Sequence, residues 1–267
     1  MSEGETVLTV ASLVVAVLAW AGLVVALLRR SPLFRSRALC LLVLAAAGLS
    51  LLALVALLKF FASHDVRDDP KYMFMYTVLG VAWVGVLRFV LGASVGVRAR
   101  DDVAERANPA AAAVQAGLIL GLTLAYAGGN FGDGPGWWVV IASAALSSSA
   151  LVGVWYLVES LGRLASLVTV ERDAATGLRA ASMLVACGAI FGRAVAGTWQ
   201  GGDALLADFA RLGWPASLIV AAEGVSQLVL RPSVESPRPS IALAGVAPSL
   251  MYLAIAAGSI YLMGWWA

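Results

Sequence analysis

The chain has 267 residues, of which 61% are hydrophobic and 13% charged, and its formal net charge is +2. Soluble domains carry about 25% charged residues. A soluble fold could not hide the apolar surface that a mean hydropathy of +0.90 implies, because protein surface still grows steeply with mass at this size. The long uncharged segments also exclude an outer-membrane barrel, because its strands are segments of about 10 residues in which apolar and polar side chains alternate. The sequence therefore predicts an all-α, polytopic transmembrane helix bundle.

Eight apolar segments each approach the length of about 20 residues that a helix needs to cross the hydrocarbon core. A ninth segment, Gly202–Leu212, places its leucines and a phenylalanine on one face, which predicts a short amphipathic helix on the membrane surface. The eight predicted spans are Thr6–Leu28, Ala38–Phe61, Tyr72–Val97, Pro109–Gly128, Trp137–Ser160, Ala174–Thr198, Pro215–Leu230 and Ile241–Trp265.

Basic residues gather in alternate connections, and such connections face the cytoplasm in helical membrane proteins. With an even number of spans, both termini are then predicted on the outer side. Six tryptophans are also predicted at that outer side, where an interfacial aromatic belt is expected. The arginines of the inner connections are Arg29, Arg30, Arg35, Arg37, Arg98, Arg100, Arg106, Arg163, Arg172, Arg179, Arg231 and Arg238. The outer tryptophans are Trp137, Trp138, Trp199, Trp214, Trp265 and Trp266.

The even-numbered spans share a local design. Span four begins at Asn108 and span six at Asp173, each a helix-capping residue followed by small residues. The odd-numbered spans carry bulkier side chains. This alternation predicts tandem, parallel hairpin repeats, with residues 1–136 and 137–267 as two four-span units of one integral bundle.

The segment from Tyr72 to Trp199 resembles the YjfL-type family of bacterial inner-membrane proteins of unknown function. The resemblance is carried by Asn108-Pro-Ala-Ala-Ala-Ala-Val-Gln-Ala-Gly-Leu-Ile-Leu-Gly, by Gly136-Trp-Trp, and by Asp173-Ala-Ala-Thr-Gly followed by Gly197-Thr-Trp. It implies a four-span unit that is doubled here, in the bacterial inner membrane. These are packing motifs, so the resemblance implies no catalytic residue.

Three pairs of glycines have the spacing that lets helix backbones approach closely in lipid. They are Gly92 and Gly96, Gly117 and Gly121, and Gly188 and Gly192. Packing between spans of one chain is the first interpretation, and a face for association with a second copy is the alternative.

Charged groups inside the membrane are the sharper signal, since each costs about 2.5–3.5 kcal/mol on insertion scales. Arg88, Arg193 and Glu223 fall inside predicted spans. Their depths predict that Glu223 pairs with Arg193, either to hold two helices in register or as an ion or proton site. Gln115 lies at a depth similar to that of Arg88, and we expect these two residues to face each other or a common cavity.

Other chemistries find little support. The single histidine, His64, lies in an acidic outer loop, which excludes bis-histidine haem and histidine-rich zinc sites. The glycine-rich segment 128–136 lacks the ending of a phosphate loop and predicts a tight outer turn. No metalloprotease or nucleophile-elbow motif occurs. We therefore expect no catalytic residue, no cofactor, no metal and no nucleic-acid partner.

These features lead to one preferred function and one alternative. The preferred function is a channel or transporter for a small polar or ionic solute, with Arg88, Gln115, Arg193 and Glu223 along its path. The alternative is a non-conducting membrane subunit or scaffold that anchors partner proteins. The expected partners are membrane lipids, with a second copy or a membrane complex as further partners. A transporter predicts a cavity that reaches the charged residues, whereas a scaffold predicts a dry core with neutralised pairs.

Overall fold

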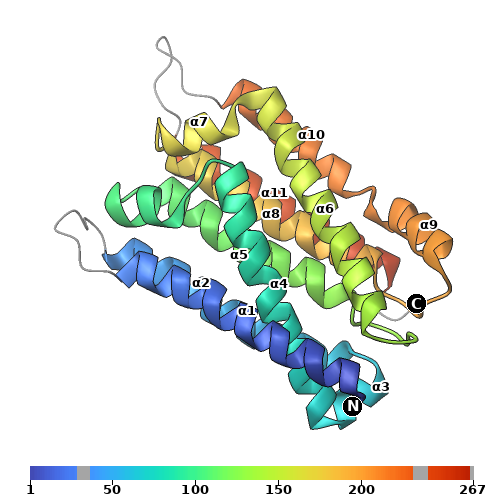
Figure 1. Cartoon of the computed structure of the whole chain (residues 1–267). Coiled ribbons are helices and arrows are strands. Elements are labelled where there is room, and N and C mark those ends of the chain that lie inside the picture. The colour runs from blue at the N-terminus through green and yellow to red at the C-terminus, as the bar shows by residue number, and fades with distance from the viewer. Residues whose placement is uncertain (29–36, 231–239, 265–267) are drawn as a thin grey trace.

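The structure is a computed structural model that describes residues 1–28, 37–230 and 240–264. Every regular element in these ranges is helical, and the long helices run between two ends of one bundle (Figure 1). In chain order the elements are α1 (Glu3–Leu28), α2 (Arg37–Phe61), α3 (His64–Asp68), α4 (Pro70–Ser94), the π-helical turn η1 (Ala99–Glu105), α5 (Pro109–Gly128), α6 (Trp137–Gly162), α7 (Leu164–Thr169), α8 (Ala174–Ala194), α9 (Gly202–Gly213), α10 (Ala216–Val229), the π-helical turn η2 (Ala242–Val246) and α11 (Ala247–Met263).

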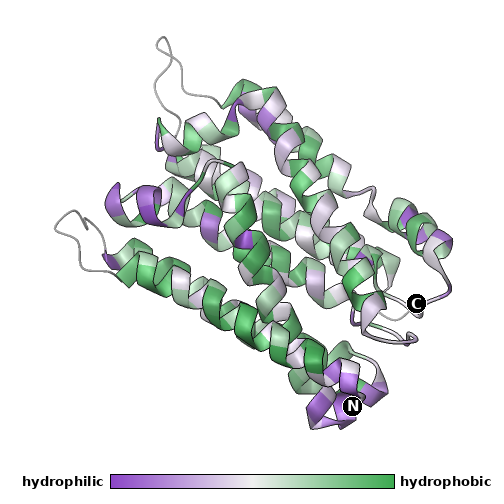
Figure 2. Cartoon of the chain, in the orientation of Figure 1, coloured by the Kyte–Doolittle hydropathy of each residue, from purple (hydrophilic) through white to green (hydrophobic). Residues whose placement is uncertain are grey.

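The described helices confirm a polytopic integral membrane protein. Seven of them are long and apolar enough to cross a membrane: α1, α2, α4, α5, α6, α8, and η2 continued by α11. The count becomes eight if α9 and α10, which meet at an angle of 44°, form one bent span. By itself α10 has 14 residues, or roughly 21 Å at 1.5 Å per residue. Hydrophobic residues cover the length of the bundle, and hydrophilic ones gather at its two ends (Figure 2).

The two ends of the bundle differ in composition. We call one the arginine-rich end: it holds η1, α7 and the beginnings of α5 and α8, with Arg98, Arg100, Arg106, Arg163 and Arg172. We call the other the tryptophan end: it holds the beginning of α6 and the loops on either side of α9, and α1 begins and α11 ends there (Figure 1). The predicted interfacial residues Trp265 and Trp266 lie outside the described residues, as do Arg29, Arg30, Arg35, Arg231 and Arg238.

Helices α5 and α8 form the centre of the bundle. In the most apolar 18-residue stretch of each helix, 78% of the residues are buried in α5 and 72% in α8. The corresponding values are 22% in α1 and 28% in α2, which lie at the edge. Contacts between the two helices advance together along the chain, from Ala110 beside Gly177 to Gly121 beside Gly188, so the helices run parallel. This contact joins the first and second halves of the chain into one bundle.

Four of the predicted packing glycines make that close contact possible. A Cβ on Gly117 or Gly121 would overlap the backbone of Ala181 or Leu184, and one on Gly188 would overlap the backbone of Gly121. A Cβ on Gly192 would likewise overlap the carbonyl of Leu124. Without a hydrophobic force between helices in lipid, such van der Waals contact is a main source of stability.

Gly92 and Gly96 do not lie together on one packing face of a helix. Helix α4 ends at Ser94, and Gly96 has a φ of +77° with open space where a Cβ would lie. A Cβ on Gly92 would face Val97 and Gln115 rather than the backbone of another helix. The physical reason is that left-handed backbone after a helix favours glycine, so Gly96 belongs to the turn that ends the helix.

The predicted caps are present at the beginnings of the two central helices. Asn108 Oδ1 accepts hydrogen bonds from the amides of Ala110 (3.0 Å) and Ala111 (3.2 Å), and Asn108 Nδ2 donates to the carbonyl of Val168 at 2.7 Å. Asp173 Oδ2 accepts from the Thr176 amide at 2.9 Å. These side chains satisfy amides that have no partner within the helix, and Asn108 also ties α5 to α7.

Candidate functional site

Glu223 lies in a closed polar network, and its partner is Arg179 rather than the predicted Arg193. Arg179 Nε lies 3.2 Å and 3.4 Å from the two Glu223 carboxylate oxygens. Both side chains are almost completely buried, with exposed fractions of 1% and 0%. The pair links α8 to α10.

The remaining polar atoms around this pair are largely satisfied. Tyr252 Oη on α11 donates to Glu223 Oε2 at 2.7 Å, and Gln227 Nε2 donates to Oε1 at 2.9 Å. Arg179 also donates to Thr176 Oγ1 at 3.1 Å and to the Ala244 carbonyl. A buried pair with this many hydrogen bonds fixes the relative positions of α8, α10 and α11, which is the register interpretation of Glu223.

The depths of the side chains along their helices explain why Glu223 does not pair with Arg193. Measured from the arginine-rich end, Arg179 is five residues after the first residue of α8, and Glu223 is six before the last residue of α10. Both are therefore roughly 8–9 Å deep. Arg193 is 14 residues further along α8, roughly 21 Å away. Arg179, which the sequence predicts in an inner connection, is six residues after the capping Asp173 and therefore lies inside α8.

Arg193 instead binds the end of α11. Its Nε and Nη2 donate to the Gly264 carbonyl at 3.0 Å and 2.7 Å. The last carbonyls of a helix have no partner within the helix and carry partial negative charge, which a cation offsets. Arg193 is therefore a structural contact at the tryptophan end, far from Glu223.

Arg88 and Gln115 line one cleft, which we call the Arg88 cleft. It has a volume of about 720 Å³ and lies between α1, α4 and η1, with Gln115 contributed by α5. Gln115 Nε2 donates to the Val97 carbonyl at 2.7 Å, while its Oε1 is buried without a hydrogen-bond partner. At the arginine-rich end the cleft is lined by Arg98 and Arg100 beside η1, whose side chains are exposed, and we call this end of the cleft its mouth.

The Arg88 guanidinium has no anionic partner among the described residues. Arg88 is 6% exposed, its Nε has no hydrogen-bond partner, and no described residue forms a salt bridge with it. The guanidinium instead lies over the ring of Trp20 in a cation–π contact, with the ring centroid 5.9 Å from Arg88 Cζ. The sequence does not predict Trp20 at this site. Trp20 lies on α1 and Arg88 on α4, so nothing in the sequence around Trp20 shows that its ring lies over Arg88.

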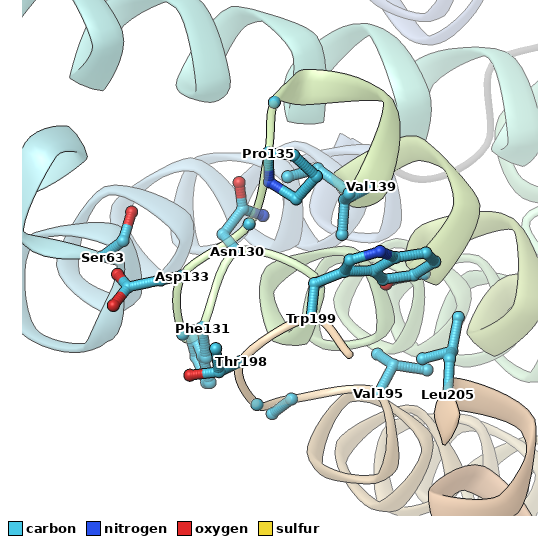
Figure 3. A pocket seen from close by; sticks show the side chains of 18 of the residues that line it. Ser63, Asn130, Phe131, Asp133, Pro135, Val139, Val195, Thr198, Trp199 and Leu205 are labelled. Atoms are coloured by element: carbon cyan, nitrogen blue, oxygen red, sulfur yellow. The ribbon is translucent and has the colours of Figure 1, made fainter. Parts of the chain in front are cut away.

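A second, smaller pocket of about 250 Å³ lies at the tryptophan end, between the glycine-rich turn and the segment before α9 (Figure 3). The two segments are joined by backbone hydrogen bonds from Gly197 to Phe131 (2.9 Å) and from Trp199 to Asp133 (2.8 Å). The rings of Trp138 and Trp199 pack edge to face, with their centroids 5.2 Å apart. The glycine-rich segment is thus the tight turn that the sequence predicts, and it is fastened to the loop after α8.

The acidic residues near this pocket do not form a metal centre. Its lining includes the carboxylates of Glu5, Asp65, Asp133 and Asp208. Among the residues that the structure describes, no three histidine, cysteine, aspartate or glutamate side chains come together in a way that could hold a metal ion. His64 pairs with Asp68 at 3.0 Å on the exposed surface of α3.

No family model, curated protein or solved structure matches the chain. The resemblance of residues 72–199 to the YjfL-type family thus stays a prediction.

Proposed function

We propose that this protein is a transporter of the bacterial inner membrane whose ligand carries negative charge and binds in the Arg88 cleft. The arginines at one end of the bundle support a cytoplasmic position for that end, because short basic connections are retained inside. The mouth of the cleft then faces the cytoplasm, and α1 begins and α11 ends on the outer side.

The observation that carries the proposal is the unpaired Arg88. An arginine inside a membrane is expensive, and such residues pair with one another or line a path for ions or substrates. Arg179 and Arg193 follow the first rule, since a carboxylate and a helix end neutralise them. Arg88 alone among these three faces a cleft of about 720 Å³ without a partner among the described residues.

Transbilayer movement in proteoliposomes tests the proposal. Two anionic probes serve, namely inorganic phosphate and a fluorescent phosphatidylglycerol. The wild type is expected to move at least one of them, and Arg88→Gln to abolish that movement. Arg163→Gln is the matched control, because it removes the same charge from an exposed position at the same end of the bundle.

The scaffold alternative also has an observation in its favour. The Arg179–Glu223 network is buried and its two charges are paired, as a non-conducting core requires, and it lines none of the cavities described above. Movement of neither probe by wild-type protein that still binds anions would contradict transport and favour a scaffold.

A further inference from the structure

The Arg88 cleft combines a buried cation with apolar walls. The walls are formed by aliphatic and aromatic side chains of α1 and α4, including Leu18, Val86 and Phe89. Leu18 and Phe89 are 68% and 70% exposed on the outside of the bundle. In a membrane-spanning helix such residues face lipid chains, so the cleft is open sideways to the bilayer as well as toward η1.

The separation of α1 from α4 creates this opening. The two helices meet at Gly85, where a Cβ would lie 2.9 Å from both Ala19 Cβ and Trp20 Nε1. Trp20 Nε1 donates to the Val81 carbonyl at 2.9 Å and holds that contact together. Toward the arginine-rich end the Arg88 cleft lies between the two helices, and around Gly22 nothing lies within 4 Å of a Cβ position. Arg88, three residues after Gly85 and on the same face, lies just beyond the contact.

The charge of the cleft is positive from its interior to its mouth. Arg88 lies inside, and Arg98 and Arg100 lie at the mouth, with Asp101 as the one acidic residue of the lining. Arg98 is 3.5 Å from Asp101 and Arg100 is 3.1 Å from Glu105, yet both arginines keep more than half of their side chains exposed. An anionic group between mouth and interior would meet a cation on each side.

These walls distinguish a lipid from a water-soluble anion. A hydrated anion would have to lose its water to reach Arg88, and it would leave most of the apolar volume without a partner. A phospholipid chain is already in the hydrocarbon phase and can slide in sideways, while its phosphate accepts hydrogen bonds from a guanidinium in the planar geometry that arginine favours.

We propose that the Arg88 cleft binds an anionic phospholipid of the surrounding leaflet. Its phosphate lies between Arg88 and the mouth arginines, and one acyl chain lies along Leu18 and Phe89 between α1 and α4. This assignment rests on the proposed function, since the lipid supplies the negative charge that Arg88 lacks, and it names the class of ligand for that site.

Native mass spectrometry of the full chain in detergent tests the assignment with two lipids that share the same chains, phosphatidylglycerol and phosphatidylcholine. The wild type is expected to bind the anionic lipid at least about tenfold more tightly, which corresponds to about 1.4 kcal/mol. Arg88→Gln is expected to remove this preference, because a neutral amide at position 88 no longer distinguishes the two headgroups.

A second variant tests the acyl chain separately from the charge. Gly22→Leu fills the open space beside the chain and is expected to weaken binding of the anionic lipid at least about tenfold, or about 1.4 kcal/mol. Gly48→Leu on α2 is the matched control, because Gly48 also has nothing within 4 Å of a Cβ position and does not line the cleft. Equal unfolding temperatures of the two variants show that both are folded.

The outcomes separate this assignment from the proposed function. Equal binding of the two lipids by the wild type, or no effect of Gly22→Leu, overturns the lipid assignment. If inorganic phosphate raises the unfolding temperature in an Arg88-dependent way while the anionic lipid does not, the ligand is a water-soluble anion and the proposed function survives. Failure of both probes to bind overturns both proposals.

Discussion

The Arg179–Glu223 pair allows a quantitative test of its structural role. Replacing Arg179 by glutamine leaves a carboxylate that is 0% exposed with two remaining hydrogen-bond donors and no charge partner. Breaking a buried pair in this way destabilises proteins by about 3–5 kcal/mol. For a chain of this size each kcal/mol lowers the unfolding temperature by about 2–4 °C, so we expect a decrease of about 6–20 °C. Thermal unfolding in detergent, followed by tryptophan fluorescence, measures it.

The double variant Arg179→Met, Glu223→Leu separates the pair from the space it fills. Replacing both charges by apolar side chains is often neutral or stabilising, so the double variant is expected to recover most of the lost stability. Glu223→Gln is expected to unfold at a lower temperature but to move anionic probes at the wild-type rate, because Glu223 does not line the Arg88 cleft. Lost transport at an unchanged unfolding temperature would refute the register role and indicate an exchanging charge.

Three further substitutions test other parts of the bundle by the same unfolding measurement. Arg88→Met is expected to raise the unfolding temperature of ligand-free protein, because it removes an unpaired buried charge; a decrease would mean that Arg88 has a partner. Gly188→Leu is expected to destabilise by about 3 kcal/mol or more through overlap with α5, whereas Gly153→Leu, with open space around it, should change little. Asn108→Ala removes a cap and is expected to cost about 0.5–2 kcal/mol; wild-type stability would contradict its role in joining α5 to α7.

The long apolar segments and their beginnings could be predicted because they depend on local chemistry. A run of about 20 apolar residues can satisfy its backbone in lipid only as a helix. Asn108 and Asp173 mark helix beginnings because their side chains accept hydrogen bonds from amides within the next three residues. Neither inference requires knowledge of a neighbouring helix, and both are confirmed.

Which side chains meet across helices depends on how the helices are placed relative to one another. The sequence alone determined that Glu223 is buried and needs a partner. Packing makes Arg179 that partner, because the lengths of α8 and α10 and their common end place the two side chains at equal depth. Likewise Arg88 could be recognised as a charge within a span, but its cleft is formed by α1, α4 and η1 beyond the contact of α1 with Gly85. Sequence position sets depth along one helix, whereas packing between helices sets the neighbour and the open space.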